Sequence, residues 1–266
     1  MVKRACRWLF ASLAAFFVAL PALAAPPEGP CTLPPGKGPF EKRTVVLPGG
    51  AELVLTWMEA GEVPTGEKKS SRKVPVEGFW IGVCEVTQKQ WTGVMETNPS
   101  HFRGEELSAA SRRAELPVEC VSWDDAMEFC RRTGLRLPTE MEWLLAQQAA
   151  RWRSPRTWTA ENSGGHTHPA GRPDALEWGL FDMDGNVSEW CADWFAPWPK
   201  APAANYAGPA TGTERVVCGG NWCGDEWFTR RLREDRLSLP PACRYNNVGF
   251  RVCLTPVPDP VGEPDE

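Results

Sequence analysis

The chain has 266 residues, of which 24% are charged, and a formal net charge of −5 at pH 7. This length suits one domain with a sizeable hydrophobic core. The acidic balance argues against binding of nucleic acid, which needs clustered basic side chains. The one basic cluster, residues 68–73, is typical of a solvated loop.

The first 24 residues have the pattern of an export signal. Lys3, Arg4 and Arg7 form a basic start, and residues 9–20 are an apolar run too short to span a bilayer comfortably. Ala22-Leu23-Ala24 then supplies a cleavage site of small residues. The sequence predicts an exported protein, periplasmic or extracellular, with no membrane attachment after cleavage.

The cysteines agree with an oxidising compartment. The chain has ten, and all except Cys6 follow the predicted cleavage site. Disulfides persist outside the reducing cytosol, so we expect several to pair. Without Cys6 the number of cysteines is odd, so at least one thiol stays unpaired within the chain. The spacing does not give the connectivity.

Composition divides the rest of the chain into three parts. Residues 25–44 are rich in Pro and Gly and predict a linker, residues 45–255 form the domain, and the acidic, Pro-rich residues 256–266 predict a disordered tail. From about residue 151 to 209 regular periodicity fails and Gly, Pro and Trp dominate. With 14 tryptophans, the core is predicted to be built from indole rings that brace loops.

Within the domain, local patterns predict three helices and a strand. A capping residue followed three positions later by an acidic or amide side chain marks each helix start: Thr87 with Gln90, Ser122 with Asp125, and Thr139 with Glu142. Gly134 predicts the end of the second helix. Residues 79–84 predict a buried strand before the first helix.

Several motifs in order resemble one family. They are residues 79–87, 98–102, 117–125, 136–143, 179–190, 219–222 and 247–251. Together they resemble the formylglycine-generating enzyme family, also called the sulfatase-modifying factor family. The resemblance implies an α+β fold: a C-type-lectin-like variant with little regular secondary structure, short helices and a small twisted antiparallel sheet.

The loop 184–189 offers oxygens that suit calcium. Calcium takes six to eight oxygen ligands from carboxylates and carbonyls. The corresponding family loop binds calcium, so the resemblance implies Gly185, Val187 and Glu189 as ligands, whereas Asn186 either binds the ion or braces the turn. Ser188 stands where the family usually has Trp. The alternative is a Gly-Asn turn with Glu189 in a salt bridge.

Two histidines, His166 and His168, lie in a Gly-rich loop. Imidazoles at this spacing can bind a transition metal. Because no third ligand is evident in the sequence, hydrogen bonding within the loop is the favoured interpretation.

The family's copper site is altered in this chain. Family members that oxidise a sulfatase cysteine hold Cu(I) between two thiolates, accompanied by a Ser and a His. Counting from Gly219-Gly220, the two Cys positions hold Gly224 and Thr229, and the Ser and His positions hold Asn221 and Asp225.

Cys218 and Cys223 have the family's spacing but bracket Gly219-Gly220 instead of following it. They are the candidate catalytic thiols and copper ligands. An odd shift along a strand turns side chains to the other face, so disulfide bonding elsewhere is the stronger interpretation. The resemblance also suggests a bridge between Cys130 and Cys253.

Two functions follow from the resemblance. The first is an exported, calcium-stabilised binding or accessory protein whose cleft, with Trp190, Asn221, Trp222 and Asp225, binds a peptide or exported protein, possibly a sulfatase. The second is an oxidase that converts a sulfatase cysteine to formylglycine, or a related periplasmic oxidase of the pyoverdine-maturation type. Function depends on the site and not on the fold, so the changed copper positions favour the first.

Overall fold

The structure is a computed structural model that describes residues 31–66, 72–103, 115–150, 157–171, 179–224 and 236–257. The predicted signal segment, most of the predicted tail, Asp225 and Thr229 lie outside these ranges. Within them, no helix is both long enough and apolar enough to cross a membrane.

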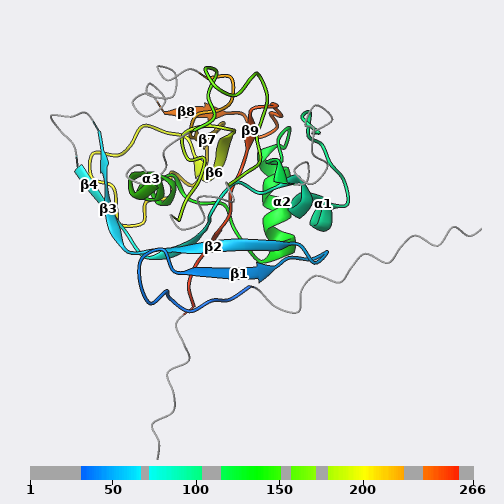
Figure 1. Ribbon diagram of the computed structural model, residues 1–266. Coiled ribbons are helices and arrows are strands. Elements are labelled where there is room, and N and C mark those ends of the chain that lie inside the picture. The colour runs from blue at the N-terminus through cyan, green and yellow to red at the C-terminus, as the bar shows by residue number, and fades with distance from the viewer. Residues whose placement is uncertain are drawn as a thin grey trace, which may run out of the picture.

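A four-stranded antiparallel sheet forms one side of the molecule (Figure 1). Its order is β1 (Lys42–Val46), β2 (Glu52–Met58), β5 (Phe79–Gly82) and β10 (Cys253–Leu254). The last strand of the chain therefore pairs with β5, which brings the two ends of the domain together. A separate hairpin of β3 (Gly61–Thr65) and β4 (Arg72–Val76) lies beside the third helix.

The second four-stranded sheet carries the motifs of the C-terminal half. Its order is β8 (Leu237–Leu239), β7 (Arg215–Cys218), β6 (Ser188–Trp194) and β9 (Val248–Gly249). β9 runs parallel to β6, while the other pairs are antiparallel. The register of β6 against β7 becomes irregular between Trp190 and Trp194.

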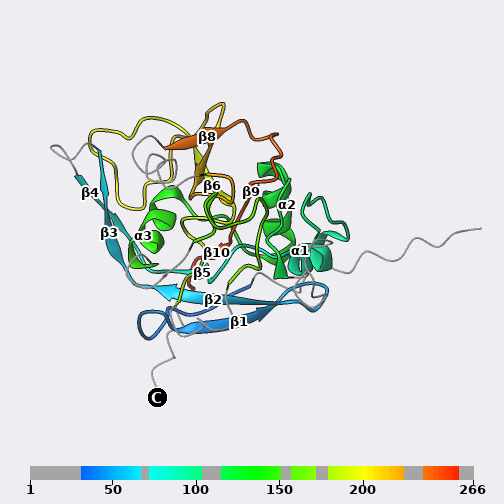
Figure 2. The same ribbon diagram turned by 45° about the horizontal axis from the view of Figure 1, so that its top comes forward.

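Three short helices complete the fold, α1 (Gln88–Met95), α2 (Trp123–Thr133) and α3 (Glu140–Ala150). In Figure 2, α1 and α2 lie together on one side and α3 lies on the other, next to the β3–β4 hairpin. All three predicted capping pairs are present. In each pair, the side chain of the capping residue accepts a hydrogen bond from the backbone N–H of its partner, and the partner's side chain accepts one from the backbone N–H of the capping residue. Gly134 ends α2 in the left-handed conformation, with φ of 70°.

Indole rings dominate the core, as the composition predicts. Trp57 and Trp80 meet edge to face with ring centroids 5.3 Å apart, and Trp91 stacks on Phe129 at 5.7 Å. Aromatic pairs of this geometry add to the stability gained from burying their area. The short helices, small sheets and long ordered loops confirm the predicted α+β architecture.

Three expectations need correction. The folded domain begins before residue 45, because β1 starts at Lys42 and the Trp80 indole donates to the carbonyl of Pro34 at 2.9 Å. The strand predicted over residues 79–84 ends at Gly82. The suggested bridge between Cys130 and Cys253 is absent, because both are buried free thiols. None of the described cysteines forms a disulfide.

Candidate functional site

A buried ion pair lies at the start of β6, where the sequence suggests a calcium ligand. Glu189 accepts hydrogen bonds from Nε and Nη2 of Arg251, at 2.6 and 2.7 Å. Nε1 of Trp143, in α3, donates to the same carboxylate at 2.7 Å. All three side chains are buried. The carboxylate therefore has its charge matched and both oxygens bonded.

Arg251 also joins three segments of the chain. Its Nη1 donates to the carbonyl of Gly82 at the end of β5, at 3.0 Å, and its Nη2 donates to the carbonyl of Phe181 at 2.9 Å. Glu189 adds β6 to this set. The guanidinium thus holds the predicted calcium loop against both sheets.

Asn186 braces the loop. Its side chain accepts from the N–H of His168 at 2.9 Å and donates to the carbonyl of the same residue at 3.0 Å. Its own carbonyl accepts from the N–H of Trp222 at 2.8 Å. A Cβ on Gly185 would lie 2.5 Å from the carbonyl oxygen of Trp158, so the loop packs too closely there for any other residue. Of the two roles that the sequence allowed for Asn186, the contacts match the brace.

The charged side chain among the predicted calcium ligands already has a partner. Calcium needs six to eight oxygens, and its one strong ligand here, the Glu189 carboxylate, is neutralised by Arg251. In the described part of the chain, no three or more His, Cys, Asp or Glu residues are grouped to hold a metal. The alternative given by the sequence, a Gly-Asn turn with Glu189 in a salt bridge, describes the arrangement.

The two loop histidines hydrogen-bond to backbone carbonyls. His168 Nε2 lies 2.7 Å from the oxygen of Ser163, and His166 Nδ1 lies 2.8 Å from that of Thr167. The His168 ring stacks on Trp158 with centroids 3.6 Å apart. Their contacts are those of a packed loop.

A second buried carboxylate lies near the ion pair. Glu85 is 1% exposed, and neither oxygen has a hydrogen-bond partner in the described structure. Burial, then the charges of Asp182 and Glu189, raise the pKa of Glu85 well above its ordinary value, with Arg251 opposing. Burial therefore favours the protonated form of Glu85, which avoids the energetic penalty of an unpaired buried charge.

The two candidate catalytic thiols have different neighbours. Cys218, at the end of β7, is buried in the same hydrophobic cluster as Cys191 of β6, and the two thiols shift each other's pKa. Cys223 is exposed, with its sulfur 3.1 Å from Oδ1 of Asn221 and 3.4 Å from Nδ2 of Asn247. As placed, Cys218 and Cys223 are not a thiol pair, so they do not fit the family's copper ion.

Asn221 closes the turn that follows Gly219-Gly220. Its Oδ1 accepts from the N–H groups of Cys223 at 3.2 Å and Gly224 at 2.9 Å, while its Nδ2 donates to Ser188 Oγ at 3.0 Å. The residue at the family's Ser position is thus a buried structural bridge between this turn and β6.

Trp190 does not line a cleft. It is fully buried in the core, and its indole donates to the carbonyl of Val121 at 3.0 Å. Trp222 is partly exposed, packs edge to face on Phe102 at 5.2 Å and donates to the carbonyl of Asn246. Residues that alternate along β6 face opposite ways, so burying Glu189 against Arg251 sends Trp190 into the other part of the core.

A shallow pocket lies between α3 and β7, with a cavity volume of about 30 Å³, or about 400 Å³ when the space open to solvent is included. Its lining combines indole rings, charged side chains, a thiol and backbone: Glu140, Trp143, Leu144, Gln147, Asp184, Trp198, Val217, Cys218, Gly219, Gly220 and Arg236. Arg236 pairs with Glu140 through two contacts of 2.5 Å, and Trp198 donates to the same carboxylate at 2.9 Å. Gln147 donates to Asp184 at 2.5 Å. The pocket thus has apolar walls and several fixed polar groups.

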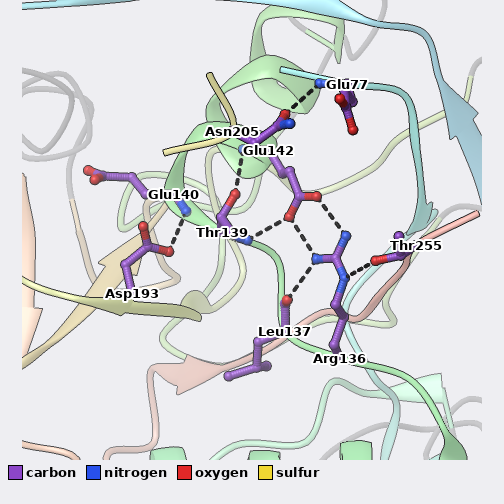
Figure 3. Close-up of polar contacts among 9 residues, drawn as sticks. All are labelled: Glu77, Arg136, Leu137, Thr139, Glu140, Glu142, Asp193, Asn205 and Thr255. Atoms are coloured by element: carbon purple, nitrogen blue, oxygen red, sulfur yellow. Dashed lines mark hydrogen bonds and ion pairs between the residues drawn. The ribbon is translucent and has the colours of Figure 1, made fainter. Parts of the chain in front are cut away.

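The N-terminus of α3 fixes one side of this pocket (Figure 3). Thr139 and Glu142 form the cap, and Glu142 accepts two hydrogen bonds from Arg136, at 2.6 and 2.7 Å. The N–H of Glu140 donates to Oδ2 of Asp193 in β6 at 2.8 Å. These contacts connect the helix start to the strand behind the pocket.

Asp193 is 1% exposed, and its Oδ1 has no hydrogen-bond partner among the described residues. Burial raises the pKa of Asp193 to about 7; the N–H of Glu140 opposes the shift and the charges of Glu140 and Glu142 add to it. The strand behind the pocket therefore carries an acid that titrates near neutral pH.

Residues 35–256 match the family of sulfatase-modifying factor enzyme 1-like domains. The chain belongs to this family. The formylglycine-generating enzyme of Streptomyces coelicolor is 34% identical over 180 residues, 57% of this chain and 57% of that enzyme's length. The chaperone protein LppX of Paenibacillus barcinonensis is 30% identical over 239 residues, 64% of this chain and 78% of that protein.

Solved structures agree with this family fold. Treponema denticola variable protein 1 is 27% identical, with a TM-score of 0.68 over 81% of this chain and 99% of its own. PvdO from Pseudomonas aeruginosa has a TM-score of 0.61 over 82% and 99%, at 19% identity, and so shows likeness of fold alone.

Sequence reasoning missed the pocket and the partners of the motif residues. Asp193 and Arg236 gave no local signal, because each is defined by a neighbour from another element. Arg251 lies in the 247–251 motif, but the sequence alone assigned it no role. A signal for Cys191 did exist: it lies two residues after Glu189 on a strand, and so on the same face.

Proposed function

We propose that this chain is an exported binding or accessory member of the sulfatase-modifying factor family that does not carry out copper-dependent oxidation. One observation carries the proposal. Gly224 occupies the family's first Cys position, and its N–H is held by Asn221 at 2.9 Å in a closed turn. The nearest alternative thiols, Cys218 and Cys223, contact different partners. A Cu(I) site needs two thiolates that can share one metal.

The pocket between α3 and β7 is the proposed binding site. Trp143 and Trp198 offer aromatic surface for an apolar side chain, and the backbone at Gly219-Gly220 is accessible to polar groups. The Arg236–Glu140 pair and Asp184 add fixed charges that would orient a ligand. This chemistry suits a peptide segment of another exported protein, with its apolar side chains against the indoles.

Peptide binding can be measured without turnover. The probe is a peptide that contains Ser-x-Pro-x-Arg, the unreactive counterpart of the sulfatase segment, and calorimetry measures its affinity for the full chain. We expect Trp198→Ala to weaken binding at least tenfold. Trp222→Ala, which removes a partly exposed indole outside the pocket, is the matched control and should bind as the parent does. Equal affinity of the parent and Trp198→Ala, or no binding by either, would reject the pocket.

The second measurement addresses the oxidase alternative. Copper-loaded protein is incubated with the Cys-x-Pro-x-Arg peptide in air, and the peptide mass is followed. We expect no change. Conversion to the aldehyde lowers the mass by about 18 Da, from replacement of the thiol carbon by a carbonyl. Such a loss, if abolished by Cys223→Ser, would establish an unusual oxidase in place of an accessory protein.

A further inference from the structure

Two thiols from neighbouring strands meet behind the pocket. β6 and β7 are antiparallel with Glu189 opposite Cys218, and Cys191 follows Glu189 by two residues, at the start of the register irregularity in β6. The positions are diagonal neighbours across the strand pair. Both side chains are buried in the same hydrophobic cluster, and each thiol shifts the pKa of the other.

The two sulfurs differ in access. Cys218 is 8% exposed and lines the pocket beside Gly219 and Gly220. Cys191 is fully buried and is not part of the lining. A molecule that enters the pocket can reach Cys218 first, and Cys191 can then reach only Cys218.

Charged groups from the surrounding elements act on both thiols. Burial is the main cause that raises the pKa of Cys191, followed by its contact with Cys218 and the charges of Asp193 and Glu140. The Cys191 hydrogen bond lowers the pKa of Cys218, but burial and the same two carboxylates outweigh it despite Arg236, so the net shift is upward. Both thiols are therefore protonated at neutral pH, and their reactions as thiolates are slow there and faster in alkali.

We propose that Cys191 and Cys218 form a dithiol site that exchanges with a disulfide entering the pocket. The Cys218 thiolate attacks one sulfur of the incoming disulfide, that S–S bond breaks, and one thiolate leaves. Cys191 then attacks the Cys218 sulfur and releases the second thiolate. Two electrons pass from the pair to the incoming disulfide, and the two thiol protons end on the two released thiols.

Closing the bridge requires a small backbone adjustment, because diagonal strand neighbours are farther apart than most bridged cysteines. Cys191 lies within the register irregularity between Trp190 and Trp194, where β6 is not held in regular pairing with β7. Strained disulfides are the readily reduced ones. The site is thus expected to be reversible. It does not depend on peptide binding at the pocket.

The test uses full-length Cys223→Ser protein and oxidised glutathione as the probe. Tryptic cleavage after Lys200 and Arg215 separates Cys191 from Cys218 but leaves Cys218 and Cys223 in one peptide, so the substitution makes the assignment unique. After exposure, remaining thiols are alkylated in denaturant and the digest is mapped without reduction. We expect to find a peptide in which Cys191 and Cys218 are linked. At pH values below the thiol pKa, its rate of formation should increase about tenfold for each unit by which the pH is raised. Treatment with excess reduced glutathione should remove the link.

Two variants and an internal control define the mechanism. Cys191→Ser should trap glutathione on Cys218, and Cys218→Ser should leave Cys191 unmodified. Cys130 and Cys253 are also buried thiols but do not line the pocket, and should stay reduced in the same sample. The proposal is overturned if Cys191 and Cys218 are both recovered alkylated after an exposure that modifies Cys223 in the parent. It is also overturned if Cys218 keeps its glutathione adduct while Cys191 is intact.

Discussion

Asp193→Asn should change how stability depends on pH. In the folded protein burial raises the pKa of Asp193 from 3.8 to about 7. A folded-state pKa above the unfolded value means that folding takes up a proton between these two values, so the stability present below pH 4 is lost as pH rises to about 7. Three pKa units correspond to about 4 kcal/mol as an upper limit. Asparagine cannot ionise, so the variant should not lose this stability as the pH rises.

Urea unfolding followed by tryptophan fluorescence, at pH values from 3 to 9, measures the effect. The asparagine amide oxygen can still accept from the N–H of Glu140, and any penalty for its buried NH2 group is the same at every pH. We therefore expect the variant to gain up to about 4 kcal/mol relative to the parent across pH 4 to 7. Asp124→Asn, on the exposed first turn of α2, is the control and should show no such gain. Parallel pH profiles of Asp193→Asn and the parent would refute the burial argument.

Three further predictions concern the loop and its ion pair. Arg251→Met leaves the buried Glu189 carboxylate without a charged partner, with only the Trp143 indole among its described donors, and should lower the free energy of unfolding by about 3–5 kcal/mol in urea titrations; a loss under 1 kcal/mol would mean that Glu189 finds another charged partner. Because Arg251 already neutralises Glu189, we expect a chelator to leave the melting temperature unchanged; a decrease that added calcium reverses would support calcium binding. Gly185→Ala brings a Cβ against the carbonyl of Trp158 and should destabilise by about 1–3 kcal/mol, whereas Gly38→Ala, where nothing lies within 4 Å, should have little effect in the same thermal melts.

Local chemistry made the helices predictable. Each cap is a contact between residues three positions apart, so Thr87, Ser122 and Thr139 specify their helix starts without help from the rest of the fold. Gly134 ends α2 for a similar reason, since glycine adopts a left-handed conformation at little energetic penalty. The family was also predictable, because its motifs keep their order along the chain.

The site was harder to predict because its contacts join distant segments. The partner of Glu189 lies 62 positions along the chain, so the sequence of the loop does not show that Arg251 pairs with this carboxylate. Likewise the matching spacing of Cys218 and Cys223 suggested a thiol pair, whereas the β6–β7 register brings Cys191 to Cys218.

The sequence by itself determined the family, the α+β class, the helix caps and the absence of cysteines at the family's copper positions. Tertiary structure decided which carboxylates are paired, as in Glu189, and which are buried without a charged partner, as in Glu85. The physical reason is that capping and turn chemistry act within a few residues, whereas burial and the neighbouring charges that set a pKa depend on which surfaces pack together.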